Sequence, residues 1–319
     1  MSMEHVYDMI IVGGGPGGYT AALYGARAGL DMLILEKLSA GGQMALTDQI
    51  DNYPGFEDGI DGFSLGEKML RGAERFGAQT KMAEVRAVRL SGAVKEIETA
   101  VGTLYGRTVI LATGATPRAL GVAGEKELIG KGISYCASCD GMFYRGKTVV
   151  IVGGGNTAAA DAILLSRICE KVFVVHRRDT LRATKIYHEP LMKAENISFC
   201  WNSTVSELLH EDKLTGVKVR NIHTGEETEI PCDGLFVCIG REPASELVKG
   251  QLELDGAGYI VADESTRTSL PGVYAVGDVR TKAFRQVVTA VGDGATAAYY
   301  ADEYLTQIAQ AQEDSALDR

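Results

Sequence analysis

Two stretches of this chain repeat one pattern of strand, glycine-rich turn, helix and strand. Residues 10–36 run from an apolar segment into the glycine-rich residues 13–18, then through a stretch of helix length to a second apolar segment that closes on Glu36. Residues 150–178 repeat this order, starting their turn at Gly153. Glycines between a strand and a helix let the backbone approach a pyrophosphate, whose charge is held by the free N–H groups of the helix start. The repeat predicts an α/β fold with two nucleotide-binding domains.

The two units differ in the residue that closes the second strand. At 23 residues after the first glycine, the first unit has Glu36, whereas the second has His176, followed by Arg177 and Arg178. A carboxylate accepts hydrogen bonds from ribose hydroxyls, and guanidinium groups pair with a 2′-phosphate. A glycine string alone is weak evidence, because tight turns also need glycine, and the second string ends on Ala158. The charge exchange in a matched context favours an FAD site in the first unit and an NADPH site in the second.

A pair of cysteines stands just ahead of the second unit. Cys136 and Cys139 form a C-x-x-C pair followed by Asp140. Such a pair is typical of a zinc half-site, an inert turn or a redox disulfide. Zinc needs two further ligands at suitable spacing, which the sequence does not offer, so no metal site is expected. A nearby carboxyl group can donate or accept the proton of a thiol that exchanges with a disulfide. We therefore favour electron flow from NADPH through flavin to the Cys136–Cys139 disulfide and on to a protein disulfide.

The composition excludes several classes of protein. Lys and Arg total 32 against 42 Asp and Glu, a net charge of −10 that disfavours binding to nucleic acid. No basic leader precedes the first strand, and no apolar stretch approaches the ~20 residues that span a bilayer, so we expect a cytoplasmic protein without a membrane partner. The other four cysteines are expected to be small core or boundary residues: Cys169, Cys200, Cys232 and Cys238.

The remaining segments predict how the domains are arranged. A helix is expected over roughly 62–76, and β-like runs end near residue 114. A strand-like segment at 269–279 and an alanine-rich helical tail have no nucleotide unit of their own, so they most simply complete the first domain. We predict a discontinuous FAD domain, 1–117 with 245–319, and an inserted NADPH domain, 118–244, each a three-layer ββα Rossmann-like domain. The polar stretch 309–319 is expected to fray.

The motifs together resemble one family. GGGPGG, GGQ, NYPG, ATGA, CASCDG, GGGNTA, HRRD with LRA, and GD with RQV occur in the order and spacing of the bacterial low-molecular-weight thioredoxin reductases, across nearly the whole length. The resemblance implies an NADPH-dependent, FAD-containing thioredoxin-disulfide reductase, with thioredoxin as its protein partner and a homodimeric assembly.

The resemblance also implies roles for individual residues. Cys139 is expected to face the flavin, Cys136 to attack thioredoxin, and Asp140 to donate the proton. The residues expected at FAD are Gly13, Gly15, Pro16, Glu36, Gly42, Gln43, Asn52, Ala112, Gly114, Gly277, Asp278, Arg285, Gln286 and Val287. The residues expected at NADPH are Gly155, Asn156, Thr157, His176, Arg177, Arg178 and Arg182.

The chain departs from the family at two places. Where the family often has an acidic pair after the second glycine turn, this chain has Ala160 and Asp161, so the first carboxylate is missing. The family commonly places Phe after the CxxCDG motif, on the apolar surface that receives the partner, and here the residue is Met142. Met fills a similar volume with softer geometry, so this change bears on partner preference rather than on the chemistry.

The nested domains predict a motion. The nicotinamide site and the cysteine pair both belong to the inserted domain, yet each must reach one flavin ring, and the thiols must then meet a bulky protein. We expect the inserted domain to rotate about two connectors near residues 115–120 and 241–247.

Three related classes of flavoprotein are disfavoured. A glutathione-reductase-type enzyme usually has a C-x-x-x-x-C pair in its first domain and an added dimerisation domain, and the chain has neither. An alkyl hydroperoxide reductase flavoprotein is expected to have thioredoxin-like domains before its first glycine turn, where this sequence has only a dozen residues. A ferredoxin-dependent relative would be expected to lose the arginines, which are present here. A reductase for another thioredoxin-like protein and a non-enzymatic flavin redox sensor stay open.

Overall fold

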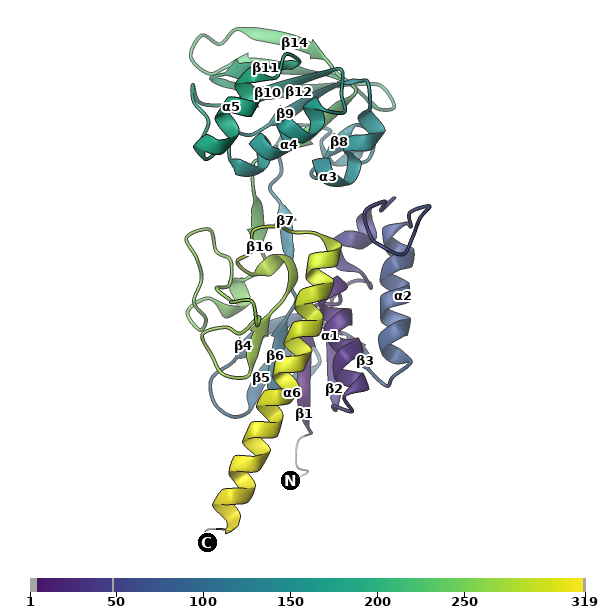
Figure 1. Cartoon of the computed structure of the whole chain (residues 1–319), viewed down its shortest axis with the longest axis vertical. Coiled ribbons are helices and arrows are strands. Elements are labelled where there is room, and N and C mark those ends of the chain that lie inside the picture. Colours follow the sequence, from purple (N-terminus) through teal and green to yellow (C-terminus); the bar gives the residue numbers. More distant parts are fainter. Residues whose placement is uncertain (1–4, 48, 318–319) are drawn as a thin grey trace. The chain divides into compact units, whose positions relative to one another are not determined.

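The chain folds into two compact units. The structure, a computed structural model, describes residues 5–47 and 49–317, with side chains up to residue 314 (Figure 1). Unit 1 comprises Met1–Thr116 and Glu242–Arg319, and unit 2 comprises Pro117–Arg241. The divisions expected from the sequence follow residues 117 and 244. The connecting segments contain strands β7 (Ala115–Pro117) and β16 (Arg241–Pro243), which pair as a two-stranded sheet.

Unit 1 is built on a seven-stranded sheet in the order β3-β2-β1-β6-β5-β4, with β17 also pairing with β6. Strands β1, β2, β3, β6 and β17 pair in parallel, whereas β4 and β5 extend the sheet as an antiparallel hairpin. Its strands are β1 (Val6–Val12), β2 (Met32–Glu36), β3 (Gln79–Met82), β4 (Val85–Arg89), β5 (Lys95–Thr99), β6 (Gly102–Leu111) and β17 (Val273–Ala275); its helices are α1 (Pro16–Arg27), α2 (Gly62–Glu74) and α6 (Val287–Leu317), with short 3-10 turns η1 (Gly42–Leu46), η5 (Glu246–Val248) and η6 (Gly277–Val279).

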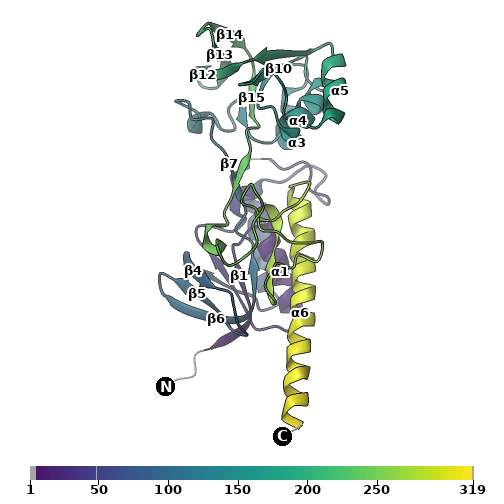
Figure 2. The same ribbon diagram turned by 90° about the vertical axis from the view of Figure 1, so that its left-hand side faces the viewer.

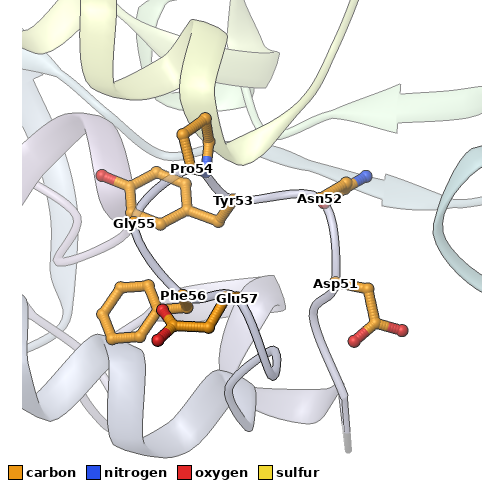
Figure 3. Close-up of a pocket in the computed structure, with 7 residues that line it drawn as sticks. All are labelled: Asp51, Asn52, Tyr53, Pro54, Gly55, Phe56 and Glu57. Carbon is orange, nitrogen blue, oxygen red and sulfur yellow. The ribbon is translucent and has the colours of Figure 1, made fainter.

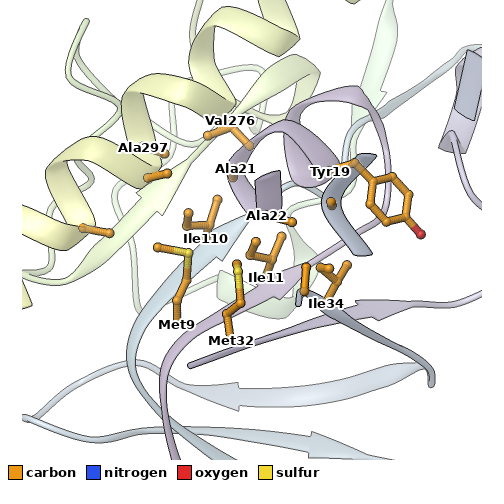
Figure 4. Packing of buried hydrophobic residues seen from close by; sticks show 14 of the residues in the cluster. Met9, Ile11, Tyr19, Ala21, Ala22, Met32, Ile34, Ile110, Val276 and Ala297 are labelled. Carbon is orange, nitrogen blue, oxygen red and sulfur yellow. The ribbon is translucent and has the colours of Figure 1, made fainter. Parts of the chain in front are cut away.

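Strand β1 is buried on both faces, as expected for a central parallel strand. Met9 and Ile11 pack with the alanines of α1 and α6 in one core cluster (Figure 4), whereas Ile10 and Val12 pack into a second cluster on the opposite face of the sheet. Figure 2 places α6 on one side of β1 and the hairpin β4–β5 on the other. The alternation along one strand thus divides the unit into layers.

Helix α6 is longer than the sequence suggested. It continues to Leu317, so the prediction that residues 309–319 fray is wrong over the described part of that stretch. Helices α1 and α6 lie so close together that a Cβ at Gly294 would collide with the carbonyl oxygen of Gly17. Buried Ala297 and Ala301 extend this contact, which fixes the start of α6 beside the glycine turn of unit 1.

Unit 2 has a five-stranded parallel sheet in the order β11-β10-β9-β15-β8 and a separate three-stranded antiparallel sheet, β12-β13-β14. On β9, Val149 and Ile151 pack with the helices, whereas Val150 and Val152 pack with the antiparallel sheet. Its strands are β8 (Ile133–Ser134), β9 (Thr148–Val152), β10 (Lys171–His176), β11 (Ile197–Trp201), β12 (Ser203–His210), β13 (Leu214–Asn221), β14 (Glu227–Pro231) and β15 (Gly234–Val237); its helices are α3 (Ala137–Asp140), α4 (Asn156–Ser166) and α5 (His188–Lys193), with 3-10 turns η2 (Lys126–Leu128), η3 (Gly141–Tyr144) and η4 (Lys185–Tyr187).

The predicted fold class is confirmed. Unit 2 has the antiparallel sheet, the parallel sheet and the helices as three layers, and unit 1 has the same α/β character with its hairpin on one side of the sheet. Each unit places a glycine turn between a central parallel strand, β1 or β9, and the helix that follows it, so the carboxyl end of each sheet can receive a nucleotide.

Candidate active site

The glycine turn of unit 1 is shaped for close approach. Gly13 follows β1 with φ +108°, and a Cβ there would collide with the carbonyl oxygen of Ala112, which follows β6. Helix α1 begins at Pro16, and its N-cap residue, Gly15, provides no side-chain cap. A Cβ at Gly15 would meet nothing within 4 Å. The first amides of α1 therefore have no side-chain partner at the cap and border open space, as a pyrophosphate site requires.

Glu36 ends β2 beside this turn. Only 8% of the residue is exposed, and its carboxylate accepts hydrogen bonds from the backbone N–H groups of Gly14 (2.6 Å), Lys37 (2.8 Å) and Leu38 (2.9 Å). An ionised carboxylate offers about four acceptor positions, so one remains for a hydroxyl group. The fixed carboxylate suits a ribose rather than a phosphate.

Two loops from distant parts of unit 1 meet at the start of α6. The side-chain amide of Asn52 donates to Oε1 of Gln286 at 3.0 Å. Asn52 belongs to the loop 51–57, which surrounds a small hollow and turns Tyr53 and Phe56 away from Asn52 (Figure 3). Gly42, the first residue of η1, lies against Gly15. Residues from four parts of the sequence thus gather near the glycine turn.

A buried ion cluster supports the turn η6. Gly277, with φ +71°, donates its N–H to Asp293 at 2.8 Å. The Asp293 carboxylate also pairs with Arg280 at 3.1 Å and with Lys282 at 2.7 Å. No motif in the sequence indicates this cluster, because Asp293 lies inside a helix 16 residues beyond Gly277. It fixes the backbone that leads into Asp278.

Arg285 is held by its own loop. Its guanidinium group donates to the carbonyl oxygens of Asp278 (3.3 Å), Lys282 (3.3 Å) and Arg280 (3.1 Å), and lies 4.0 Å from the ring centroid of Tyr259. These contacts shape the segment that precedes Gln286 and Val287, where α6 begins.

Strand β6, which pairs with β17, leads into Ala112 and Gly114. The carbonyl oxygen of Gly114 accepts a hydrogen bond from the N–H of Ala244 at 2.9 Å. The predicted flavin residues of unit 1 therefore fall on seven segments, namely the carboxyl ends of β1, β2, β6 and β17, the turn η1, the loop 51–57 and the start of α6.

The glycine turn of unit 2 repeats the geometry of the first. Gly153 has φ +149°, and a Cβ there would collide with the carbonyl oxygen of Cys238. Gly155, the N-cap residue of α4, again provides no side-chain cap and has open space at its Cβ position. Asn156 accepts the N–H of Thr184 at 2.8 Å, which ties the following loop to the turn.

His176 lies under this turn, where a Cβ on Gly154 would collide with the imidazole ring. Burial is the main cause that lowers the pKa of His176, and the charges of Arg178 and Arg182 lower it further. Its Nε2 atom is buried and has no hydrogen-bond partner within the part of the chain that is described. The ring therefore stays neutral at physiological pH and supports the glycine loop.

Three arginines surround the end of β10. Arg177, Arg178 and Arg182 are exposed, and none forms an ion pair with an acidic side chain among residues 5–47 and 49–314. The N–H of Arg182 donates to the carbonyl oxygen of Gly154 at 2.7 Å, so the third arginine is anchored at the turn. Three unpaired guanidinium groups beside an open helix start fit a phosphate ester well.

Cys136 and Cys139 form a disulfide at the start of the short helix α3. The N–H groups of Cys139 and Asp140 both donate to the carbonyl oxygen of Cys136, at 3.3 and 3.1 Å. Ser134 donates its hydroxyl to Oδ2 of Asp140 at 2.6 Å and accepts the N–H of Cys136 at 3.1 Å. Ser134, which no sequence motif indicates, therefore links the carboxylate to the first cysteine.

Two apolar side chains follow the disulfide. Met142 and Phe143, in η3, are each about half exposed. By contrast, Tyr144 is partly buried against Phe236, with ring centroids 5.2 Å apart. Burial, followed by the charge of Asp140, raises the pKa of Tyr144 to about 12, so its hydroxyl stays protonated. An exposed apolar pair beside a redox disulfide is suited to contact another protein.

The other cysteines are buried or half-buried, as predicted. Cys238 donates its thiol to Oδ2 of Asp161 at 3.2 Å. Burial raises the pKa of Cys238 well above its usual value and also raises the pKa of Asp161. This pair, which joins β15 to α4, was not foreseen, because the two residues lie 77 positions apart.

Known proteins share this arrangement over almost the whole chain. Residues 7–294 match the family described as pyridine nucleotide-disulphide oxidoreductase. The thioredoxin reductase of Streptomyces coelicolor is 46% identical over 96% of both chains. That of Listeria monocytogenes is 44% identical over 99% of both. The chain belongs to the thioredoxin reductase family.

A solved structure agrees with this assignment. The thioredoxin reductase of Streptococcus pyogenes is 42% identical, and it matches with a TM-score of 0.89 over 96% of this chain and 100% of its own. As a member of the thioredoxin reductase family, the chain is an oxidoreductase that uses flavin and pyridine nucleotide. Among the residues that the structure describes, no helix is both long and apolar enough to cross a membrane.

Proposed function

We propose that the protein is an NADPH-dependent thioredoxin-disulfide reductase that contains FAD. The observation that carries this proposal is the Cys136–Cys139 disulfide, which lies in the same unit as a nucleotide turn flanked by three arginines. A disulfide next to a hydrogen-bonded carboxylate is suited to thiol exchange, and the arginines supply the preference for a phosphorylated nicotinamide nucleotide.

The fit of unit 1 to FAD rests on the open glycine turn and on Glu36. The uncapped amides of α1 are available to a pyrophosphate, and the buried carboxylate has an acceptor position left for a ribose hydroxyl. Bound FAD would relay two electrons from NADPH to the disulfide. Gln286 and Val287, at the start of α6, and Asn52 would orient it.

The thiol steps follow from the cysteines themselves. The Cys136 thiolate attacks one sulfur of the thioredoxin disulfide and forms a mixed disulfide, and the other thioredoxin sulfur leaves as a thiolate that takes a proton from Asp140. The Cys139 thiolate then attacks Sγ of Cys136, which restores the enzyme disulfide and releases the second thioredoxin sulfur as a thiolate that takes up the proton given up by the Cys139 thiol. The enzyme dithiol loses two electrons and thioredoxin gains two. Met142 and Phe143 would contact thioredoxin during this exchange.

The test is a turnover assay with purified protein. NADPH oxidation is measured with thioredoxins, with other thioredoxin-like proteins and with a ferredoxin, beside the same reactions with NADH. We expect repeated NADPH turnover that depends on thioredoxin. Cys139→Ser should abolish thioredoxin reduction while the flavin absorbance remains, and Cys200→Ser serves as the control with an intact disulfide. Absence of repeated turnover would favour a redox sensor instead.

The assembly and location are also part of the proposal. We propose that the protein is cytoplasmic, because the scattered free cysteines suit a reducing compartment. We also propose that it forms a homodimer, as the resemblance to the family implies. Light scattering coupled to size-exclusion chromatography would measure the mass of the assembly, and a monomer at working concentration would contradict the dimer.

A further inference from the structure

The residue that follows the redox segment is chemically unlike the aromatic residue that the family commonly has there. Met142 is 54% exposed and lies three positions after Cys139 in the sequence. Its neighbour Phe143 is 51% exposed. A Met thioether is oxidised to a sulfoxide by peroxides, whereas Phe at the same position would be inert.

Met142 also has a polar partner. Nη2 of Arg145 donates to Sδ of Met142 at 3.8 Å. A sulfoxide oxygen is a far stronger acceptor than a thioether sulfur, so the guanidinium group that now contacts the sulfur weakly would hold the oxidised side chain. Met82 and Met192 are exposed to a similar degree, 56% and 58%, which makes them matched comparisons.

We propose that Met142 is a methionine sulfoxide site through which hydroperoxides weaken recognition of the protein disulfide substrate. This inference rests on the proposed function. In the step, the Met142 sulfur attacks the distal oxygen of a hydroperoxide, the O–O bond breaks, and a sulfoxide and an alcohol or water form. The sulfur loses two electrons and the peroxide gains them. The proton of the distal oxygen moves to the leaving oxygen.

The effect on binding follows from polarity. A partner that covers Met142 and Phe143 buries apolar surface. A sulfoxide that is hydrogen-bonded to Arg145 would have to lose its water in the same contact, which costs binding free energy. The KM for thioredoxin should therefore rise about tenfold, the order expected from losing one apolar side chain at an interface. Small disulfides need no such contact, so their reduction should not change.

The cysteines do not obscure this reaction. In the disulfide form Cys136 and Cys139 carry no thiol, and Cys169, Cys232 and Cys238 are buried. Cys200 is half-buried, and burial raises its pKa, so little of it is present as the thiolate that peroxide oxidises. The purified flavoprotein is therefore treated with hydrogen peroxide before NADPH is added, and the peroxide is removed with catalase. Peptide mass spectrometry measures the sulfoxide at each of the nine methionines. Steady-state assays then give kcat and KM for thioredoxin and for a small aromatic disulfide.

Three variants separate the possible outcomes. In Met142→Leu the treated and untreated enzymes should have the same KM for thioredoxin, whereas Met192→Leu should respond like the parent. In Arg145→Gln the sulfoxide would lose its guanidinium partner, so the peroxide-treated variant should show a smaller rise in KM for thioredoxin than the treated parent. A methionine sulfoxide reductase should restore the KM of the treated parent.

Two results would overturn the inference while thioredoxin reduction in the untreated enzyme remains intact. One is a sulfoxide at Met142 that leaves the KM for thioredoxin unchanged or lowers it. The other is a yield at Met142 below that at Met82 and Met192. If the untreated enzyme fails to reduce thioredoxin, this result would contradict the proposed function, and the present inference would fall with it.

Discussion

Among single residues, the glycines of the two turns have their role from the local backbone, whereas the polar residues of the site have theirs from side chains brought together by the fold. Gly13 and Gly153 adopt positive φ and face a carbonyl oxygen, so any side chain there would collide, and their positions could be predicted from the turn alone. Ser134 could not be predicted, because its hydroxyl gains a role only when α3 brings Asp140 within 2.6 Å. Side-chain partners depend on the tertiary fold, whereas glycine turns depend on the local backbone.

The arginines at the end of β10 give the first prediction. Replacing Arg177 and Arg178 together by Ala should raise the KM for NADPH more than tenfold and leave the KM for NADH nearly unchanged, since a charge-assisted phosphate contact contributes about 1.5–3 kcal/mol. Steady-state kinetics with both nucleotides, and quenching of Trp201, the one tryptophan of the chain, would measure this. Arg167→Ala, an exposed site on the same unit, is the control. Equal losses with both nucleotides would contradict recognition of a 2′-phosphate.

Asp140 gives the second prediction. Asp140→Asn keeps an acceptor for Ser134 but cannot donate a proton, so thiol–disulfide exchange with thioredoxin should slow by about a hundredfold. Stopped-flow measurement of the exchange step would show it. Ser134→Ala removes the hydrogen bonds to Asp140 and from the N–H of Cys136. Only the first, worth about 1 kcal/mol, acts on the carboxylate, so the step should slow by less than tenfold. Similar rates in Asp140→Asn and the parent would assign the proton transfer to another group.

At the scale of elements, periodicity predicted strands and helices well, and their ends less well. Strand β1 alternates between two cores, and α2 runs over Gly62–Glu74, close to the expected 62–76. The polar composition of residues 309–319 did not predict that α6 continues to Leu317. Packing against α1 forms the first turns of α6, and a helix that has already formed extends easily into polar residues. The sequence also gave no reason to place a lysine in the core, yet Lys95 on β5 is fully buried.

Lys95 gives the third prediction. Its Nζ has no hydrogen-bond partner among the described residues and lies 5.5 Å from the ring centroid of Tyr304 on α6. Burial lowers the pKa of Lys95 below 10.5. Removing the buried amine by Lys95→Met should therefore raise the free energy of unfolding by about 1–3 kcal/mol at pH 7.

The same substitution should change the pH dependence. Between the lowered pKa and 10.5 the unfolded chain binds more protons than the folded one, so the stability of the parent rises with pH in that window, and this rise should vanish in the variant. Urea unfolding at several pH values would measure both effects. Lys249→Met, at an exposed site, is the control. A loss of stability in Lys95→Met would mean that the contact with Tyr304 outweighs desolvation.

At the scale of the whole molecule, the discontinuous organisation could be predicted because the final strand and helix have no glycine turn of their own. Strand β17 pairs with β6, and α6 packs on α1, so the end of the chain completes unit 1. Each hydrophobic core cluster draws its residues from one unit only. Separate cores joined by two short segments permit each unit to behave as a rigid body.

The fourth prediction concerns motion between the units. The predicted nicotinamide site and the disulfide belong to unit 2, and a flavin held by unit 1 would have to meet both in turn, so the cycle requires unit 2 to rotate. A bifunctional lysine cross-linker that joins the two units should abolish steady-state thioredoxin reduction. In single-turnover experiments, each cross-linked molecule should retain either reduction of the flavin by NADPH or electron exchange between flavin and disulfide. The monofunctional reagent, which modifies the same lysines without joining the units, controls for loss of charge. Cross-linked protein that turns over at the full rate would exclude the rotation, because one fixed arrangement would then suffice for both half-reactions.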